Sequence, residues 1–284
     1  MNCKKITSLA LAALTIATVA SFAACKDAQS SSLKVIEYTL TEEKYAYAVN
    51  EGNVAMKNAI DGYLDSIKAN GTFNAIVSKY DTEETSSYVG IDVASQSAAP
   101  GANDLVVLTN TPFGKFEFVG EGGKYYGIDM EIAAGFAQSQ NKDLFIVEWA
   151  NFDTILNQFN TYPDAIVMAG LSIDEDRELI VDFSQEYFSA GQAIIALSSD
   201  TTFDDCNSAD AVKAKLSSLS GKKIGYQSGT TAGMLLQEEY SQITAQGFAT
   251  AVLAAQALIN GSIDYVIVDQ SPAKAIVDQL NVIA

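Results

Sequence analysis

The sequence has 284 residues, 48% of them hydrophobic, with 35 Asp and Glu against 17 Lys and Arg, no histidine and a formal net charge of −18. This charge disfavours nucleic acid as a partner, because phosphate binding requires clustered cations. The composition also excludes histidine-containing catalytic triads, His-ligated zinc and a zinc ribbon, so we expect one large or two small globular domains without a metal or cofactor.

The amino-terminal residues predict export. Two lysines precede an apolar run that ends at Ala24, a pattern typical of a secretory signal peptide over residues 1–24. The residues before Cys25 resemble a bacterial lipobox, although Phe22 stands where leucine is usual. We therefore expect Cys25 to be lipid-modified and residues 25–32 to form a lipid-anchored tether. An ordinary signal peptide with a coincidental cysteine is the alternative.

The segment that follows the tether combines one alternating stretch with two amphipathic ones. It predicts a strand over residues 45–49 and helices over 54–68 and 73–80. Residues 81–103 are small and polar and lack helical periodicity, so we expect a linker there.

From residue 104 onward, short apolar runs alternate with helical patterns, which is the rhythm of a mostly parallel sheet covered by helices. The rhythm restarts after residue 200, so two α/β lobes fit better than one sheet. The expected strands are residues 105–108, 144–148, 165–168, 223–226 and 265–268, and the expected helices are 127–138, 152–159, 209–219, 231–240 and 249–259.

Several of these segments carry a family resemblance when they are taken together. They are Asn110–Val119 with Gly127–Ala133, then Ala169–Arg177 with Val181–Ser184, Gly225–Thr231 and Asp264–Asp269. In this order they resemble the amino-acid-binding proteins of ABC importers, the extracytoplasmic solute-binding family 3. The resemblance implies a two-lobed, periplasmic-binding-protein-like α/β fold of type II, with two hinge strands and a ligand cleft between the lobes.

The order of the segments implies a circular permutation. Residues 39–80 resemble the carboxy terminus of that family, yet they come first in this chain. The resemblance then places hinge strands at residues 43–49 and 192–197. Lobe 1 becomes residues 45–193, with 81–103 as the permutation linker, and lobe 2 becomes residues 194–284 plus 33–44. On this reading residues 33–38 lie in the sheet of lobe 2, beside strand 265–268.

Arg177 is the expected partner of a ligand carboxylate. It is the one arginine of the sequence, and a guanidinium pairs with a carboxylate through two parallel hydrogen bonds. A solvated ion pair with Asp174 or Glu178 is the alternative. The resemblance adds the backbone N–H of Gly170 and the hydroxyl of Ser172 to the carboxylate site.

Two more parts of the site come from the second lobe. Thr230 and Thr231 begin a helix directly after a strand, and the free backbone N–H groups at a helix start suit an anion such as the ligand carboxylate. The alternative is that Thr230 simply caps this helix. Asp269 ends an apolar strand, where an unpaired acid is costly, so we expect it to bind the ligand ammonium. A structural hydrogen bond to a helix start is the other reading of Asp269. The resemblance adds the carbonyl of Ala169 to the ammonium site.

The resemblance also implies a side-chain site. Phe113 and Phe152 match positions that hold the ligand side chain, although such phenylalanines are often simply core. Because Asn110 is neutral where binders of cationic amino acids commonly have an acid, we expect a polar or neutral amino acid as ligand. The side-chain site is expected to comprise Asn110, Phe113, Phe152, Gln227 and Gln270.

The implied function is that of a receptor rather than an enzyme. We expect a monomer, lipid-anchored outside the cytoplasm, that closes its lobes on a free amino acid and delivers it to an ABC permease and its ATPase. Two alternatives stay open: a dehydratase that reuses the cleft, and an amino-acid sensor or adhesion module without a transporter.

Overall fold

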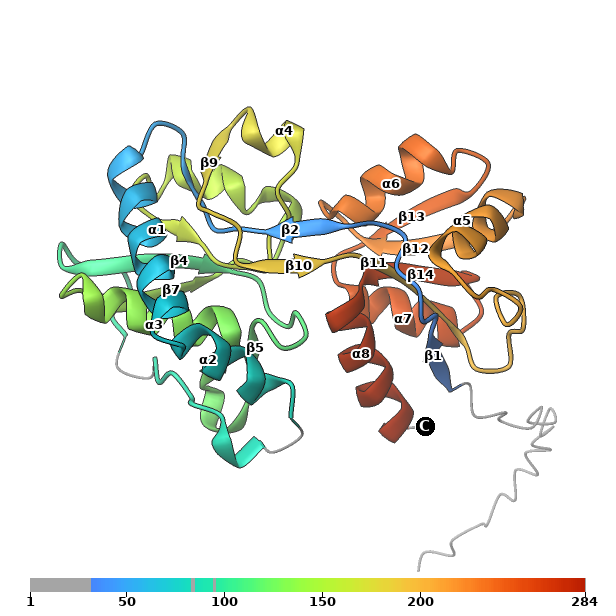
Figure 1. Cartoon of the computed structure of the whole chain (residues 1–284), viewed down its shortest axis with the longest axis horizontal. Helices are drawn as coiled ribbons and strands as arrows, with labels where there is room; N and C mark the ends of the chain where they lie inside the picture. The colour runs from blue at the N-terminus through green and yellow to red at the C-terminus, as the bar shows by residue number, and fades with distance from the viewer. Residues whose placement is uncertain (1–31, 83–84, 94–95, 284) are drawn as a thin grey trace, which may run out of the picture. The chain divides into compact units, whose positions relative to one another are not determined.

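The computed structural model describes residues 32–82, 85–93 and 96–283 (Figure 1). The predicted signal peptide and the predicted lipidation site Cys25 lie outside the described residues. Among the helices described, none has the length and apolar character needed to cross a membrane.

The first of two five-stranded sheets is built from the middle of the chain. Strand β4 lies parallel to both its neighbours, β7 and β8, while β3 is antiparallel to β8 and β9. Across the sheet the order is β7 (Asp143–Glu148), β4 (Asp104–Thr109), β8 (Ile166–Val167), β3 (Ala48–Asn50) and β9 (Val181–Phe183).

Alternate residues of these strands face two different cores, as the pleat of a strand requires. Val107 packs in a core with α1 (Val54–Ala69), α2 (Thr72–Tyr80) and α3 (Ile128–Ser139). Its neighbour Leu108 packs in a second core with the 3₁₀ helices η3 (Phe152–Thr154) and η4 (Leu156–Asn160). A short hairpin of β5 (Phe118–Val119) and β6 (Tyr125–Tyr126), with the 3₁₀ turn η2 (Glu121–Gly123) between them, precedes α3.

The second sheet combines the first strand of the described chain with the carboxy-terminal part. Its order is β1 (Leu33–Val35), β11 (Gln192–Leu197), β14 (Tyr265–Asp269), β12 (Lys223–Gln227) and β13 (Thr244–Phe248). Ile194 faces a core with α5 (Ala209–Ser218) and α6 (Thr231–Glu239), while Ile195 faces a core with α7 (Ala251–Ile259) and α8 (Gln270–Ile283). Helices therefore cover both faces (Figure 1).

Two antiparallel strands connect the sheets. Strand β2 (Glu43–Tyr45) runs from the second sheet to the first, and β10 (Phe188–Ala190) runs back, with Phe188 opposite Tyr45 (Figure 1). The expectation that residues 192–197 form a crossing strand is wrong. These residues are an apolar run buried on both faces, so they form an inner strand of the second sheet, and the preceding residues 188–190 pair with β2 instead.

Most other expected strands and helices are confirmed within a few residues, and the structure adds short elements that were not expected, among them β5, β6, β9 and β10. Residues 152–159 form 3₁₀ helices, and neither β13 nor α8 was expected. Residues 33–35 do lie in the second sheet, but beside β11 and not beside 265–268. This follows from the hydrogen-bonding register, because β11 pairs with β1 on one edge and with β14 on the other.

The expected linker, residues 81–103, contains one 3₁₀ turn, η1 (Thr85–Ser87), and otherwise lacks regular structure where it is described. It is nevertheless attached to the first sheet. Ile91 bridges to Tyr125, and the side chain of Gln96 bonds the backbone N–H and carbonyl of Ile146 at 2.9 and 2.8 Å. The segment therefore packs as part of this side of the molecule.

The end of α8 lies against β1. The N–H of Leu33 donates to Asn281 Oδ1 at 2.8 Å, and Asn281 Nδ2 donates to the carbonyl of Leu33 at 3.0 Å. Segments separated by 248 positions are thus joined by a reciprocal pair of hydrogen bonds.

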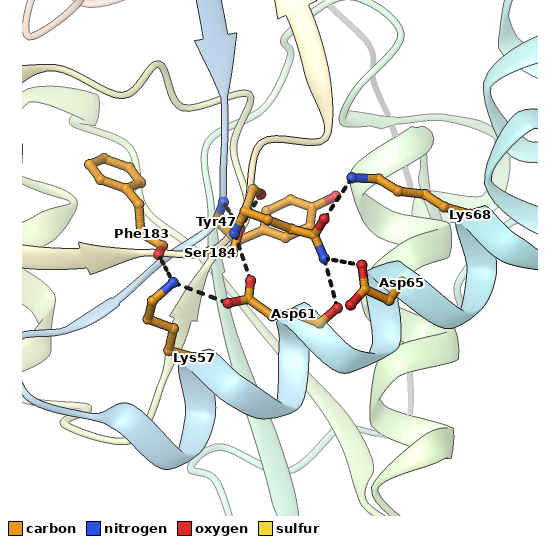
Figure 2. Close-up of polar contacts among 8 residues, drawn as sticks. Tyr47, Lys57, Asp61, Asp65, Lys68, Phe183 and Ser184 are labelled. Carbon is orange, nitrogen blue, oxygen red and sulfur yellow. Dashed lines mark hydrogen bonds and ion pairs between the residues drawn. The ribbon is translucent and has the colours of Figure 1, made fainter.

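Helix α1 is hydrogen-bonded to the segment that links β9 to β10 (Figure 2). Lys57 Nζ donates to the carbonyl of Phe183 at 2.6 Å and pairs with Asp61 at 3.0 Å. Asp61 Oδ1 accepts from the N–H of Gln185 at 2.6 Å, and the Gln185 amide reaches the carbonyl of Asp61 and the carboxylate of Asp65. The crossing segment is thereby held against the first sheet.

We expect Asp61→Ala to lower the free energy of unfolding by about 1–3 kcal/mol, because it leaves the N–H of Gln185 and the ammonium of Lys57 without this acceptor. Asp65→Ala is the matched control, since Asp65 is exposed on the same helix and has one bond to Gln185. Urea unfolding of both variants measures the difference. Equal stability of the two variants would contradict this role of Asp61.

Candidate functional site

A narrow pocket lies at the carboxyl ends of strands from both sheets. Such strand ends are where open α/β sheets bind ligands. Nearly all of the expected site residues meet here, although their chemical roles stay predictions. The lining residues are Asn110, Phe113, Glu117, Phe152, Ala169, Gly170, Ser172, Arg177, Gln227, Thr230, Thr231 and Asp269.

Arg177 is buried, with 6% of its surface exposed, and contacts loops of both sheets. Its Nη1 donates to the carbonyl of Ser172 at 2.5 Å, and its Nη2 donates to the carbonyl of Gly229 at 2.9 Å. Nε lies 2.9 Å from Asp174 Oδ2, so the alternative ion pair is present, although it is buried rather than solvated. Each terminal nitrogen carries a second hydrogen, which leaves two donors for a ligand.

Asp174 also sets the backbone at Arg177. It is the N-cap of the short helix α4 (Glu175–Glu178), and its Oδ1 accepts from the N–H of Arg177 at 3.0 Å. The guanidinium lies over the ring of Phe152, 5.8 Å from its centre. Burial lowers the pKa of Arg177, and the nearby acids oppose this effect. The side chain is therefore a fixed, charged part of the pocket wall.

The hydroxyl of Ser172, which was expected to bind a ligand carboxylate, already has an acceptor, and so does the hydroxyl of Thr231. Ser172 Oγ donates to Glu43 Oε2 at 2.5 Å, and Thr231 Oγ1 donates to the same oxygen at 2.9 Å. Since a hydroxyl has one hydrogen, neither can donate to a ligand without leaving Glu43. Sequence reasoning missed Glu43, because it lies in β2 while Ser172 and Thr231 come from distant segments of the chain.

Thr230 is the N-cap residue of α6, but its side chain makes no capping bond. Its hydroxyl instead donates to the carbonyl of Gln227 at 2.8 Å. The N-capping alternative is therefore wrong for this side chain.

The N–H of Gly170 is also occupied, contrary to expectation. It donates to Asp129 Oδ2 at 2.9 Å, and Asp129 Oδ1 accepts from the hydroxyl of Tyr47 at 3.1 Å. Gly170 has φ +51°, and an added Cβ would lie 2.4 Å from the Phe113 ring, so a larger residue is excluded. A glycine is required here by the close packing of Phe113.

Asp269 is 4% exposed at the end of β14, and Tyr45 donates its hydroxyl hydrogen to Oδ1 at 2.5 Å. Burial, followed by the charge of Glu43, raises the pKa of Asp269 to about 7. The hydrogen-bond partner is thus a tyrosine of the crossing strand β2, which the sequence did not indicate. A cation beside Asp269 would favour its ionised form.

The expected side-chain residues divide into two groups. Gln227 Nε2 donates to Asn110 Oδ1 at 2.9 Å, and Asn110 Nδ2 donates to the carbonyl of Trp149 at 2.7 Å, so these amides connect the two sheets. Gln270 does not line this pocket. It follows Asp269 directly, and its amide reaches the carbonyl of Glu37 at 3.4 Å, in a separate groove beside Tyr80 and Lys115.

Glu117 lines the pocket and was missed from the sequence. Its side chain is 0% exposed and lies beside the carboxyl group of Asp129. Burial, followed by the neighbouring Asp129, raises the pKa of Glu117 well above its usual range. The only sequence signal was an acid between two phenylalanines, Phe116 and Phe118. Across the described residues, no group of three or more possible ligands could hold a metal ion.

Comparison with known proteins identifies the family. The description "Bacterial extracellular solute-binding proteins, family 3" matches residues 105–270. The chain belongs to this family. A relative described as a probable histidine-binding protein, from Neisseria gonorrhoeae, is 27% identical over 184 residues, which are 64% of each chain. An arginine-binding periplasmic protein from Mannheimia haemolytica is 28% identical over 59% of this chain and 63% of its own length. The match thus spans just under two thirds of these relatives.

A solved structure gives a similar picture of the family's fold. The ancestral amino-acid-binding protein AncCDT-1, described as a precursor of cyclohexadienyl dehydratase, is 28% identical and has a TM-score of 0.55, over 63% of this chain and 74% of its own. Our chain therefore has the fold of a type II periplasmic amino-acid-binding protein.

The raised pKa of Asp269 predicts a pH-dependent stability. Because the folded protein holds this proton up to about pH 7 and the unfolded chain only to about pH 4, burial of Asp269 costs stability as the pH rises through this window. We expect the unfolding free energy of the ligand-free protein, relative to Asp269→Asn, to fall by up to about 1.4 kcal/mol per pH unit there. Urea unfolding at pH 5.0 and 7.5 measures the difference. Parallel pH curves for the two proteins would show that Asp269 does not titrate in this way.

Proposed function

We propose that this protein is an extracytoplasmic receptor that binds one free amino acid in the pocket and delivers it to an ABC permease and its ATPase. One observation carries the proposal: a buried guanidinium with two unused donors and a buried acid line the same small pocket. A free amino acid has the complementary pair of charges. Membership in a family of extracellular solute-binding proteins supports the same conclusion.

The carboxylate of the ligand would bind to Arg177. The remaining Nη1 and Nη2 donors form a fork that matches the two oxygens of a carboxylate. Ser172 and Thr231 would assist if their hydroxyls turn from Glu43 toward the ligand. The main chain of Thr230 and Thr231, at the start of α6, adds the positive end of a helix.

The ammonium of the ligand would bind to Asp269, with the carbonyl of Ala169 as a second acceptor. Tyr45 would keep its hydrogen bond to Asp269 and hold the carboxylate in place. The arriving ammonium would lower the pKa of Asp269 from its present value of about 7 and so ionise the acid. The ligand would thereby satisfy a group that is costly to bury alone.

We also propose that binding is coupled to closure of two lobes. The expected boundary between residues 193 and 194 moves to the start of β11, because Gln192–Leu197 belongs wholly to the second sheet, so the lobes become residues 45–191 and residues 192–284 plus 33–44. The contacts that would form on closure include Arg177 with Gly229, and Asn110 with Gln227. Each pair joins a loop of the first sheet to the second. The paired strands β2 and β10 would act as the hinge.

The amino terminus would place the receptor outside the cytoplasm. A signal peptide over residues 1–24 and a lipid on Cys25 would keep a monomeric receptor at the outer face of the cell membrane, beside its permease. Two acyl chains would suffice for stable attachment.

We expect the melting temperature of the ligand-stripped protein to rise with one or a few of the twenty common amino acids, because a ligand that binds only the folded state stabilises it. Arg177→Lys keeps the charge but loses the fork, so we expect affinity about ten- to a hundred-fold lower by calorimetry. Its own melting temperature without ligand serves as the folding control. Unchanged affinity in this variant would exclude Arg177 as the carboxylate partner.

The dehydratase alternative has one specific support, the likeness to a precursor of such an enzyme. If no amino acid shifts the melting temperature, loss of water from a cyclic prephenate-like substrate is the assay to run next. Binding of an amino acid without an associated permease would instead favour the sensor reading.

We propose further that the chain is a circular permutation of the family's usual order. The supporting observations are the match that begins at residue 105, and the hydrogen bonds that join Asn281 to Leu33. Permutation requires such closeness between the segments that would be rejoined.

This proposal predicts that the usual order can be restored. A variant that joins residue 283 to residue 32 through a short Gly-Ser linker and is opened among the exposed residues 97–99 should fold. We expect the same circular dichroism spectrum and the same ligand-induced shift in melting temperature as for the original order. A control opened at the same place but not rejoined should lose stability. A rejoined variant that does not fold would contradict the permutation.

A further inference from the structure

Glu43, in the crossing strand β2, accepts hydrogen bonds through both of its carboxylate oxygens. Ser172 Oγ and Thr231 Oγ1 donate to Oε2 at 2.5 and 2.9 Å. Thr41 Oγ1 and Gln192 Nε2 donate to Oε1 at 2.9 and 3.1 Å. Four donors thus surround one carboxylate of the chain, which is the kind of shell that a bound carboxylate ligand requires.

We propose that Glu43 is an internal competitor of the ligand carboxylate, which takes the hydroxyl donors of Ser172 and Thr231 and thereby lowers the affinity of the pocket. This inference rests on the proposed amino-acid-binding function and adds a residue that tunes it. Glu43 is not part of the pocket wall. It lies behind the two hydroxyls and lines a neighbouring groove.

The direction of the two hydroxyls decides what they offer to a ligand, because each has a single hydrogen. Both hydrogens are used by Glu43, so the oxygens can present only lone pairs to the pocket, and lone pairs repel a carboxylate. Gln192 Nε2 also donates to Thr231 Oγ1 at 3.0 Å, which directs the hydrogen of Thr231 toward Glu43. A ligand carboxylate must therefore break two existing hydrogen bonds before it gains these donors.

Backbone bonds hold Glu43 beside Ser172. Tyr45, two residues after Glu43, forms a β-bridge with Ser172. The carbonyl before Tyr45 and the N–H after it bond to the residues that flank Ser172, at 2.9 and 3.0 Å. Because strand β2 is fixed against this segment, Glu43 cannot withdraw from the hydroxyl of Ser172 by a small shift of the strand.

The groove on the other side of Glu43 offers it no cation. Among the described residues that line it there is no lysine or arginine, but there are six further acids. They are Glu42, Asp174, Glu175, Asp176, Glu238 and Glu239. Repulsion by these acids opposes a turn of Glu43 into the groove, so the hydroxyl donors remain its favourable partners.

The charge of Glu43 also reaches into the pocket. After burial, it is the next cause that raises the pKa of Asp269 to about 7. The same repulsion acts on a ligand carboxylate that binds between Arg177 and the two hydroxyls. Glu43 thus opposes that carboxylate both by holding its donors and by its charge.

The test compares the original chain with Glu43→Gln, which keeps the size of the side chain and removes its charge. Dissociation constants are measured by calorimetry on ligand-stripped protein at pH 7.5. The probes are L-arginine, L-histidine and L-glutamine, each with its α-carboxamide, which lacks the carboxylate charge. Glu42→Gln is the matched control, because it removes the same charge from an exposed neighbour in the same groove.

We expect Glu43→Gln to bind the best of the three amino acids about ten-fold more tightly than the original chain, because the hydroxyls can then donate to its carboxylate. The affinity for the carboxamides should change by less than about three-fold, and Glu42→Gln should bind as the original does. Glu43→Asp keeps the charge but is one methylene shorter, so it should also gain affinity. In a chain that carries Ser172→Ala and Thr231→Val, adding Glu43→Gln should bring no gain.

Equal or weaker amino-acid binding in Glu43→Gln would overturn the inference, and weaker binding would show that Glu43 instead helps to hold the two lobes together. An equal gain in Glu42→Gln, or for the carboxamides, would also overturn it. Melting temperatures without a probe report whether each variant folds, and Glu43→Asp carries the test if Glu43→Gln does not. If the original chain binds an amino acid and neither variant gains affinity, the receptor function stands and only the role of Glu43 fails. If no amino acid binds to any of these proteins, both fail.

Discussion

The arrangement of the site depends on the buried guanidinium of Arg177. It donates to the carbonyl of Ser172, which follows β8 of the first sheet, and to the carbonyl of Gly229, which follows β12 of the second. Because the group is desolvated, these bonds and the ion pair with Asp174 are strong, and their loss would leave a buried charge unpaired. One side chain thus joins the loop that carries Ser172 to the loop that precedes α6.

The acids around this guanidinium explain the unusual protonation of the site. Glu43, Glu117, Asp129 and Asp269 share a region in which Arg177 is the cation. Burial raises the pKa of Glu117, Asp129 and Asp269, and a neighbouring acid adds to this effect for Glu117 and for Asp269. The values are about 6 for Asp129 and about 7 for Asp269. Burial thus favours the protonated form of these acids near neutral pH, and a positive charge beside them would favour their ionised form.

The hydrogen-bond partners of several polar groups could not be predicted from the sequence. Gln270 follows Asp269 in sequence, but it opens α8 and its side chain lies in a different groove. The N–H of Gly170 was expected to be free, yet Asp129, 41 positions earlier, accepts from it. Glu43 was overlooked because the hydroxyls of Ser172 and Thr231 reach it from distant segments. In each case the partner of a polar group lies far away in the sequence, where periodicity and motifs carry no information.

The sequence by itself determined the α/β class, most strands and helices, and the motifs that place eleven expected residues around one pocket. It could do so because apolar runs record burial locally, and because strand ends followed by glycine, serine, threonine or acids mark the ligand edge of a sheet. The tertiary structure alone decided which donors are already used, which strands cross between the sheets, and that Glu117 is buried beside Asp129. These properties depend on hydrogen bonds and desolvation between residues brought together by folding, and neither is encoded in the spacing of residues along the chain.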